Sequence, residues 1–174
     1  MTEPINFDEQ GNLFPHCPIP LPLPSIKRIL VYSENRSYLW NQFAGYIKAM
    51  KNLLQTDKFE VWIDGAFTTQ TTEPRIITFC LCIEPRWINR LDAKTRQRIN
   101  QLIDNGLPPS STCQELEKRF HCRTQILLND PPNSVHYPFT HPIYEKKKQD
   151  FLHDVNGNPK GFMIYHKQKG PDDT

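Results

Sequence analysis

The sequence has no long apolar stretch, no strong excess of charge of either sign and no regular cysteine spacing. No run approaches the roughly 20 apolar residues that span a bilayer, so we expect no membrane contact. The first eight residues are polar and acidic and do not resemble a signal peptide. The chain has 21 basic and 19 acidic residues, a net charge of +2. General nucleic-acid binders usually carry a larger or more clustered basic excess.

The cysteines favour a reducing compartment. They number five, an odd count, and their spacing is irregular: Cys17, Cys80, Cys82, Cys113 and Cys122. Such a pattern does not build a disulfide framework, so we expect a cytoplasmic protein. The signatures of several enzyme classes are lacking too, because the chain has no G-x-S-x-G elbow, no Walker loop and no dinucleotide-binding glycine motif.

What is present is the pattern of one domain in which helices and strands alternate. The chain has 174 residues, of which 37% are hydrophobic, enough for a single core. Hydrophobic spacing predicts helices over residues 36–54, 92–104, 112–120 and 142–151, and strands over 59–63, 76–83, 123–128 and 161–166. We therefore predict an α/β (α+β) domain over residues 31–170, followed by a tail at 171–174.

Several residues are expected to set the ends of these elements. Asp92 is expected to cap the second helix, Thr112 with Glu115 forms a capping-box pattern for the third, and Pro142 fits the first position of the fourth. The strand over 76–83 is apolar at nearly every position, so we expect it to be central and covered on both faces.

The first 30 residues form a proline-rich segment. Prolines recur at positions 15, 18, 20, 22 and 24. Because proline fixes φ and lacks an N–H, we expect residues 1–30 to be extended and to lie outside any sheet interior. Two interpretations stay open: a strap across the domain, or a docking motif for a partner that reads proline-rich segments.

Three short segments carry a resemblance to a known family. Residues 7–13 read F-D-E-Q-G-N-L, residues 62–69 read W-I-D-G-A-F-T-T, and residues 156–162 read N-G-N-P-K-G-F. In this order they resemble the opening, middle and closing motifs of a bacterial domain family of unknown function. Its proteins are similar to nucleotidyltransferases of the polymerase-beta type. The resemblance implies a nucleotidyltransferase-like fold, a small mixed sheet flanked by helices.

The residues that such an enzyme needs are missing at the matching positions. Nucleotidyl transfer relies on divalent ions, and Mg²⁺ requires converging carboxylates. The resemblance implies a D-x-D pair where this chain has Ile76 and Thr78, a third acid where it has Arg123, and a serine where it has Ala66. Asp64 alone does not clamp a metal ion. We therefore expect no catalysis, no metal and no cofactor.

Three functional hypotheses remain open. The first is a pseudoenzyme that binds a protein partner through Phe67, Arg75, Ile76 and Arg123, as an antitoxin, immunity or accessory subunit of a toxin–antitoxin or anti-phage defence system; it rests on fold analogy. The second is an active nucleotidyltransferase with an unorthodox metal site. The third is a nucleotide or RNA binder without catalysis, which would use Gly65, Ala66, Thr68, Thr69 and Lys160.

Overall fold

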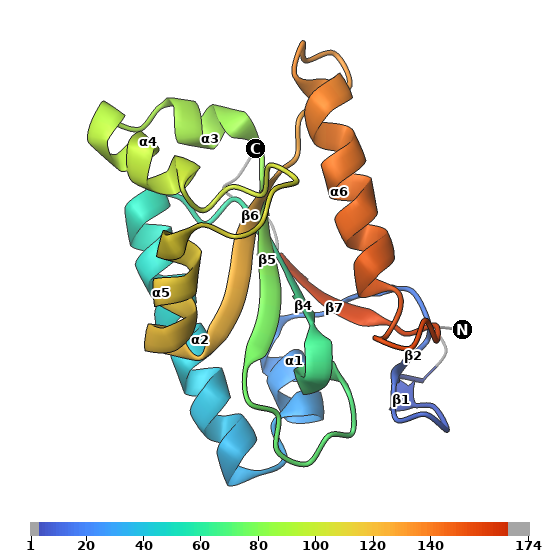
Figure 1. Cartoon of the computed structure of the whole chain (residues 1–174). Helices are drawn as coiled ribbons and strands as arrows, with labels where there is room; N and C mark the ends of the chain where they lie inside the picture. The colour runs from blue at the N-terminus through green and yellow to red at the C-terminus, as the bar shows by residue number, and fades with distance from the viewer. Residues whose placement is uncertain (1–3, 167–174) are drawn as a thin grey trace, which may run out of the picture.

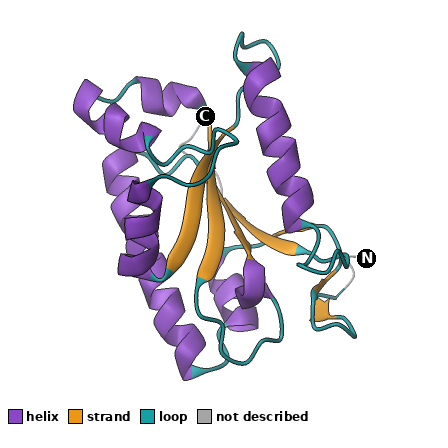
Figure 2. Cartoon of the chain, in the orientation of Figure 1, coloured by secondary structure: helices purple, strands orange, loops and turns teal. Residues whose placement is uncertain are grey.

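A five-stranded mixed sheet forms the centre of the protein (Figures 1 and 2). The computed structural model describes residues 4–166, so the expected tail at 171–174 lies outside the described residues. The strand order is β3-β7-β4-β5-β6. Strand β4 runs antiparallel to both neighbours, and the other four strands share one direction. The bounds are β3 Pro18–Pro20, β4 Glu60–Asp64, β5 Ile77–Ile83, β6 Cys122–Leu128 and β7 Phe162–His166. The α/β prediction is confirmed.

Helices cover both faces of this sheet, and Figure 1 shows α6 on one side with α2, α3, α4 and α5 on the other. Alternation along β5 explains the two layers: Phe79 and Leu81 join the large core under α2, whereas Cys80 and Cys82 join a smaller core under α6. All residues of β5 except Thr78 are buried, as expected for the central strand. The helices are α2 Glu34–Leu54, α3 Pro85–Asn89, α4 Ala93–Asn100, α5 Ser111–Phe120 and α6 Tyr137–Phe151.

Three helix boundaries differ from the prediction. Helix α4 is capped by Asp92 as expected but ends at Asn100, because residues 102–104 pair instead with Ile126 of the edge strand β6. The cap of α5 is Ser110, whose hydroxyl accepts from the Cys113 amide, so the capping-box prediction was wrong. Helix α6 begins at Tyr137, and Pro142 lies inside it. Pro138 occupies the first turn, the position assigned to Pro142 from the sequence.

The proline-rich segment is part of the fold. It contains β1 (Asn6–Phe7), β2 (Leu13–Phe14), the edge strand β3 and helix α1 (Leu23–Leu30). Helix α1 corrects the expectation that residues 1–30 are extended throughout: Pro24 fits its first turn, and Ile26 and Leu30 are fully buried in the core. Strand β3 lies at the edge of the sheet, as expected for a segment outside its interior.

Candidate functional site

Three residues from neighbouring strands form a row across one face of the sheet. Asp64 pairs with Thr78 between β4 and β5, and Thr78 pairs with Arg123 between β5 and β6. Because paired residues point to the same face, the three side chains share the face that α6 partly covers. Ile76 lies just before β5, two residues from Thr78, and is half-buried. Thr78 and Arg123, two of the three positions at which the resemblance implies carboxylates, are therefore paired beside Asp64. We call Asp64, Thr78 and Arg123 the central row.

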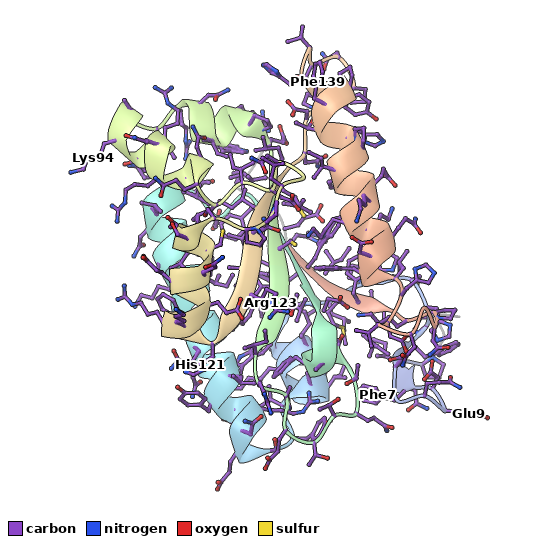
Figure 3. The ribbon with its side chains drawn as sticks, viewed as in Figure 1. Phe7, Glu9, Lys94, His121, Arg123 and Phe139 are labelled. Atoms are coloured by element: carbon purple, nitrogen blue, oxygen red, sulfur yellow. The ribbon has the colours of Figure 1, made fainter. Side chains whose placement is uncertain are left out.

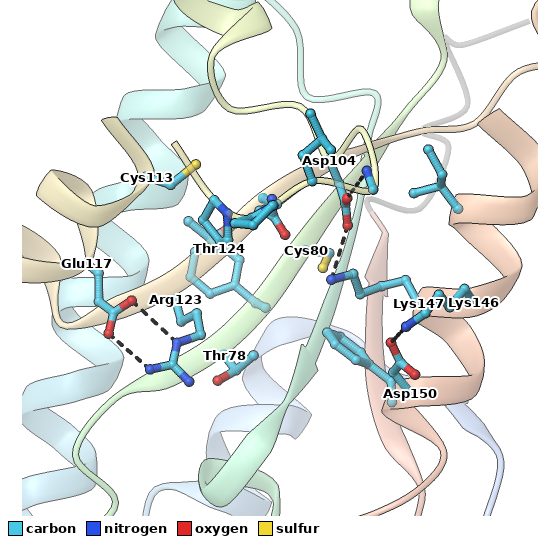
Figure 4. A pocket seen from close by; sticks show the side chains of 18 of the residues that line it. Thr78, Cys80, Asp104, Cys113, Glu117, Arg123, Thr124, Lys146, Lys147 and Asp150 are labelled. Carbon is cyan, nitrogen blue, oxygen red and sulfur yellow. Dashed lines mark hydrogen bonds and ion pairs between the residues drawn. The ribbon is translucent and has the colours of Figure 1, made fainter. Parts of the chain in front are cut away.

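An acidic side chain engages the arginine of this row. Glu117 on α5 accepts hydrogen bonds from Arg123 Nε at 3.4 Å and from Arg123 Nη2 at 3.2 Å (Figure 4). The Arg123 side chain is 61% exposed, so water screens the pair and a partner has access to the guanidinium. Figure 3 shows Arg123 beside the sheet, with His121 at the preceding corner of α5.

The aspartate of the row is buried and is also paired. The Lys160 ammonium donates to the Asp64 carboxylate, and both side chains are almost fully buried. Burial raises the pKa of Asp64 to about 6, whereas the Lys160 charge and its hydrogen bond act in the opposite direction. Lys160 was predicted to contact a nucleotide, but in the structure its ammonium is buried and paired with Asp64.

The turn after β4 packs tightly on the row. Residues Gly65–Thr68 form the 3-10 helix η1. Gly65 has a φ of +74°, and a Cβ atom there would lie 2.8 Å from Thr78 Oγ1, so only glycine fits. The Thr68 hydroxyl donates to the Gly65 carbonyl, and the Thr69 hydroxyl donates to the Ala66 carbonyl. Of the predicted nucleotide contacts, Ala66 is exposed, whereas the two threonine hydroxyls already serve the turn itself.

A buried arginine that was not predicted from the sequence holds this turn in place. Arg36 on α2 has 0% exposure, and its guanidinium donates to four backbone carbonyls: those of Leu30, Phe67, Thr69 and Thr71. The signal was present in the sequence, because Arg36 is in phase with the apolar stripe of the helix. A charged residue on such a stripe requires buried polar partners.

Phe67 is a core residue. It is fully buried, stacks on Trp40 with ring centroids 6.3 Å apart, and lies under the Arg36 guanidinium. The expectation that Phe67 lies on a binding surface is therefore corrected. Arg75 is exposed and stays available on the loop before β5.

The three segments that carry the family resemblance meet beside the row. The side-chain amide of Asn12 donates to the Asp154 carboxylate, just before the closing segment. The backbone N–H of Gly161 donates to the Leu13 carbonyl, and the Lys160 ammonium donates to Asp64. They surround a cavity of about 530 Å³. It is lined by Gln10, Asn12, Asp64, Gly65, Ala66, Thr69, Thr71, Asp150, Phe151, His153, Asp154, Val155 and Lys160. Its charged groups include three carboxylates and one ammonium, and the ammonium is already paired.

A second cavity, of about 570 Å³, opens on the other side of the row between β5, β6, α5 and α6. Thr78, Cys80 and Gln125 belong to its lining. Three ion pairs line it as well: Arg123–Glu117, Lys147–Asp104 and Lys146–Asp150 (Figure 4). Burial raises the pKa of the Cys80 thiol to about 12, so this thiol is protonated at neutral pH. We call this cavity the vacated cleft; Arg75 and Ile76 do not line it but lie on the loop that leads into β5, two to three residues before its lining residue Thr78.

Within residues 4–166, no group of three or more histidine, cysteine, aspartate or glutamate side chains is placed to hold a metal ion. In the same part of the chain, no helix is both long enough and apolar enough to cross a membrane.

Comparison with known proteins gives one family. The family model described as "Family of unknown function (DUF6932)" matches residues 5–164, which include the proline-rich segment, the central row and the closing loop. No curated protein and no solved structure matches the chain.

Proposed function

The chain belongs to DUF6932, a family of unknown function, and we propose that it is a nucleotidyltransferase-like domain that has lost its metal clamp and acts by binding a protein partner. The central row carries this proposal. Where the resemblance implies carboxylates, Thr78 supplies one neutral oxygen and Arg123 a positive charge. The one remaining carboxylate, Asp64, is neutralised by Lys160.

Electrostatics explains why this row is unsuited to a divalent ion. Mg²⁺ is held by hard oxygen ligands, most often carboxylates, in octahedral geometry. A guanidinium in the neighbouring strand position repels the ion, and Asp64 can bind it only by giving up its buried contact with Lys160. An uncompensated buried ammonium would then remain, at a cost of several kcal/mol.

The scaffold around the row supports a relation to nucleotidyltransferases. A tight glycine turn follows β4 and rests on the start of β5, and the three site positions lie on adjacent strands at the same end of the sheet. The resemblance implies such a turn, followed by two acids on one strand, at the positions of Ile76 and Thr78, and a third on the adjacent strand, at Arg123. The departures from the motifs fall on the groups that perform chemistry, while the glycine that shapes the turn is retained.

The observations favour a protein over a nucleotide as the bound partner. The threonine hydroxyls of the turn and the Lys160 ammonium are engaged internally, and the cavity beside them has three carboxylates. Outside the Asp64–Lys160 pair, the carboxylates of this lining are those of Asp150 and Asp154, which disfavour a phosphate group. In contrast, the arginines Arg75 and Arg123 are exposed beside Ile76, and arginine is enriched among the residues that dominate protein interfaces.

We propose further that the partner is a toxin or a defence-system subunit and that both proteins meet in the cytoplasm. The first part rests on analogy with nucleotidyltransferase-like antitoxins. The second rests on the cysteines, which are all free thiols, four of them buried.

Affinity capture from the native host tests this function. The partner is identified by mass spectrometry with the wild-type protein as bait, purified, and titrated against Arg75→Glu and Arg123→Glu. Arg123 lines the vacated cleft and Arg75 is exposed on the loop that leads into β5, so each charge reversal is expected to weaken binding about tenfold or more. Arg98→Glu, an exposed reversal on α4, is the matched control and is expected to bind as the wild type does.

Melting temperature is measured first, so that a folding defect is not mistaken for lost binding. Unchanged affinity of both cleft variants would show that the vacated cleft is not the interface.

A further inference from the structure

The groove between α1 and α2 has an apolar floor and a basic rim. Its volume is about 380 Å³. The floor consists of Leu23, Pro24, Trp40, Phe43, Ala44 and Ile47, and the rim of Lys27, Lys48 and Lys51. The lining residues from α2 run from Trp40 to Lys51, so the groove follows that helix for about three turns, roughly 16 Å. This is the dimension of a short helix or peptide rather than of a single small ion.

The rim lysines have no internal counter-charge. Within the described residues, no ion pair and no side-chain hydrogen bond engages Lys27, Lys48 or Lys51. The stretch 23–54 contains five basic residues and one acidic residue, a net charge of +4, whereas the whole chain carries only +2. The single acid, Glu34, lies 14 positions before Lys48 on the same helix, about 21 Å away along its axis. Three of these five basic residues line the apolar groove, whereas Arg36 is buried at the turn after β4.

We propose that the α1–α2 groove binds an acidic amphipathic helix of a protein partner. Apolar side chains of that helix, at spacing i, i+3 or i+4, and i+7, lie against Leu23, Pro24 and Ala44, the accessible part of the floor. Trp40, Phe43 and Ile47 are buried beneath them, and the carboxylates of the helix face the rim lysines. Ala44, on the groove floor, is small and exposed, so a second helix can approach α2 closely at this position. This surface is separate from the vacated cleft, and only the class of its occupant rests on the proposed binding function.

A synthetic probe tests the groove while the natural partner is still unidentified. The probe is a dye-labelled helical peptide of roughly 18 residues, with leucines at i, i+3 and i+7 and glutamates on the flanks. A scrambled peptide of the same composition controls for net charge. Fluorescence anisotropy should show saturable binding of the amphipathic peptide that weakens as salt increases, and weaker binding of the scrambled one.

Paired charge reversals locate the binding. Lys48→Glu with Lys51→Glu is expected to lower the affinity for the amphipathic peptide about tenfold or more. Lys94→Glu with Arg98→Glu changes the net charge equally at two exposed positions of α4 that do not line the groove, and is expected to bind as the wild type does. Figure 3 labels Lys94. Ala44→Tyr fills the groove from an exposed position and is expected to weaken binding without lowering the melting temperature.

Three outcomes would overturn the proposal: no saturation, equal binding of the scrambled peptide, or equal losses in both double variants. Binding to vesicles of anionic lipid that depends on Lys48 and Lys51, without peptide binding, would also overturn it and assign the groove to a lipid surface. These results are independent of the vacated cleft, because Arg75 and Arg123 are unchanged in all of these variants.

Discussion

At the scale of single residues, Arg36 shapes the site more than any side chain that faces it. A fully buried guanidinium without a carboxylate partner is costly unless its donors are satisfied. Here four carbonyls accept from its two terminal nitrogens, whereas its Nε has no hydrogen-bond partner among the described residues. The ring centroids of Tyr32 and Phe67 lie 4.4 and 5.0 Å from its Cζ atom. One arginine thus ties the start of α2 to the turn that packs on the central row.

We predict that Arg36→Met lowers the free energy of unfolding by at least about 3 kcal/mol, since it leaves several buried carbonyls without a donor. Urea denaturation followed by circular dichroism measures the effect. Arg28→Met is the control: Arg28 is exposed on α1, so the expected change stays within about 0.5 kcal/mol. Equal losses in the two variants would show that the carbonyl contacts of Arg36 contribute little.

Two glycines should respond in opposite ways to the same substitution. Gly45 lies in the middle of α2, and a Cβ atom added there would meet no other atom within 4 Å, so Gly45→Ala should stabilise the protein by about 0.5–1 kcal/mol. Gly65→Ala should destabilise it by more than about 1 kcal/mol, because of its positive φ and the 2.8 Å approach to Thr78. The same denaturation experiment measures both, and a destabilised Gly65→Ala is required if the turn rests on β5 as described.

At the scale of elements, helices and strands with strong local patterns were predicted correctly, whereas boundaries that depend on tertiary contacts were not. The hydrophobic periodicity of α2 and the apolar runs of β4, β5 and β6 specify whether each segment is a helix or a strand and where it lies. This is because buried positions recur in the sequence with the period of the element. Helix α1 escaped detection because its prolines suggested an extended chain, although proline also suits a first helical turn. The early end of α4 depends on pairing with Ile126, a contact with no local signal.

The edge strand β3 shows what the prolines do. The Leu21 amide donates to Ile164 of β7, so by alternation the nitrogens of Pro18 and Pro20 face away from the sheet. Proline has no N–H to offer there, and the outer edge of β3 cannot template another strand. The described part of the segment therefore supplies an edge strand whose prolines protect the edge of the sheet.

The closing loop is held by Asp154, and its stability should depend on pH. Hydrogen bonds from the Asn12 and Asn158 side chains and from backbone amides hold the pKa of Asp154 well below its usual range. A carboxylate with a lowered pKa in the folded state contributes stability that is present above about pH 4 and is lost as the pH falls further. We predict that wild-type stability falls as the pH is lowered from about 4 to about 2.

Asp154→Asn tests this assignment, because an amide does not titrate. Urea midpoints across the same pH range should fall less steeply for the variant than for the wild type. If the urea midpoints of the two proteins fall equally with pH, other carboxylates are responsible for the loss of stability in acid.

At the scale of the whole molecule, the sequence indicated candidate positions on adjacent strands but not the side chains that surround them. The resemblance identified Thr78 and Arg123, and the structure brings them into one row with Asp64. It did not predict that Glu117 engages Arg123 or that Lys160 engages Asp64, because these partners come from distant segments. Phe67 was misassigned because an aromatic residue in a glycine turn has the same sequence pattern whether it packs inward or outward.

The central claim is that this row no longer supports nucleotidyl transfer, and label transfer tests it most directly. Purified protein is incubated with labelled ATP, GTP, CTP and UTP, with Mg²⁺ or Mn²⁺, and with RNA, protein extracts and the protein itself as acceptors. We predict no metal-dependent transfer above a protein-free control. Metal-dependent labelling by the wild type that is lost in a folded Asp64→Asn variant would contradict the account and restore an active enzyme.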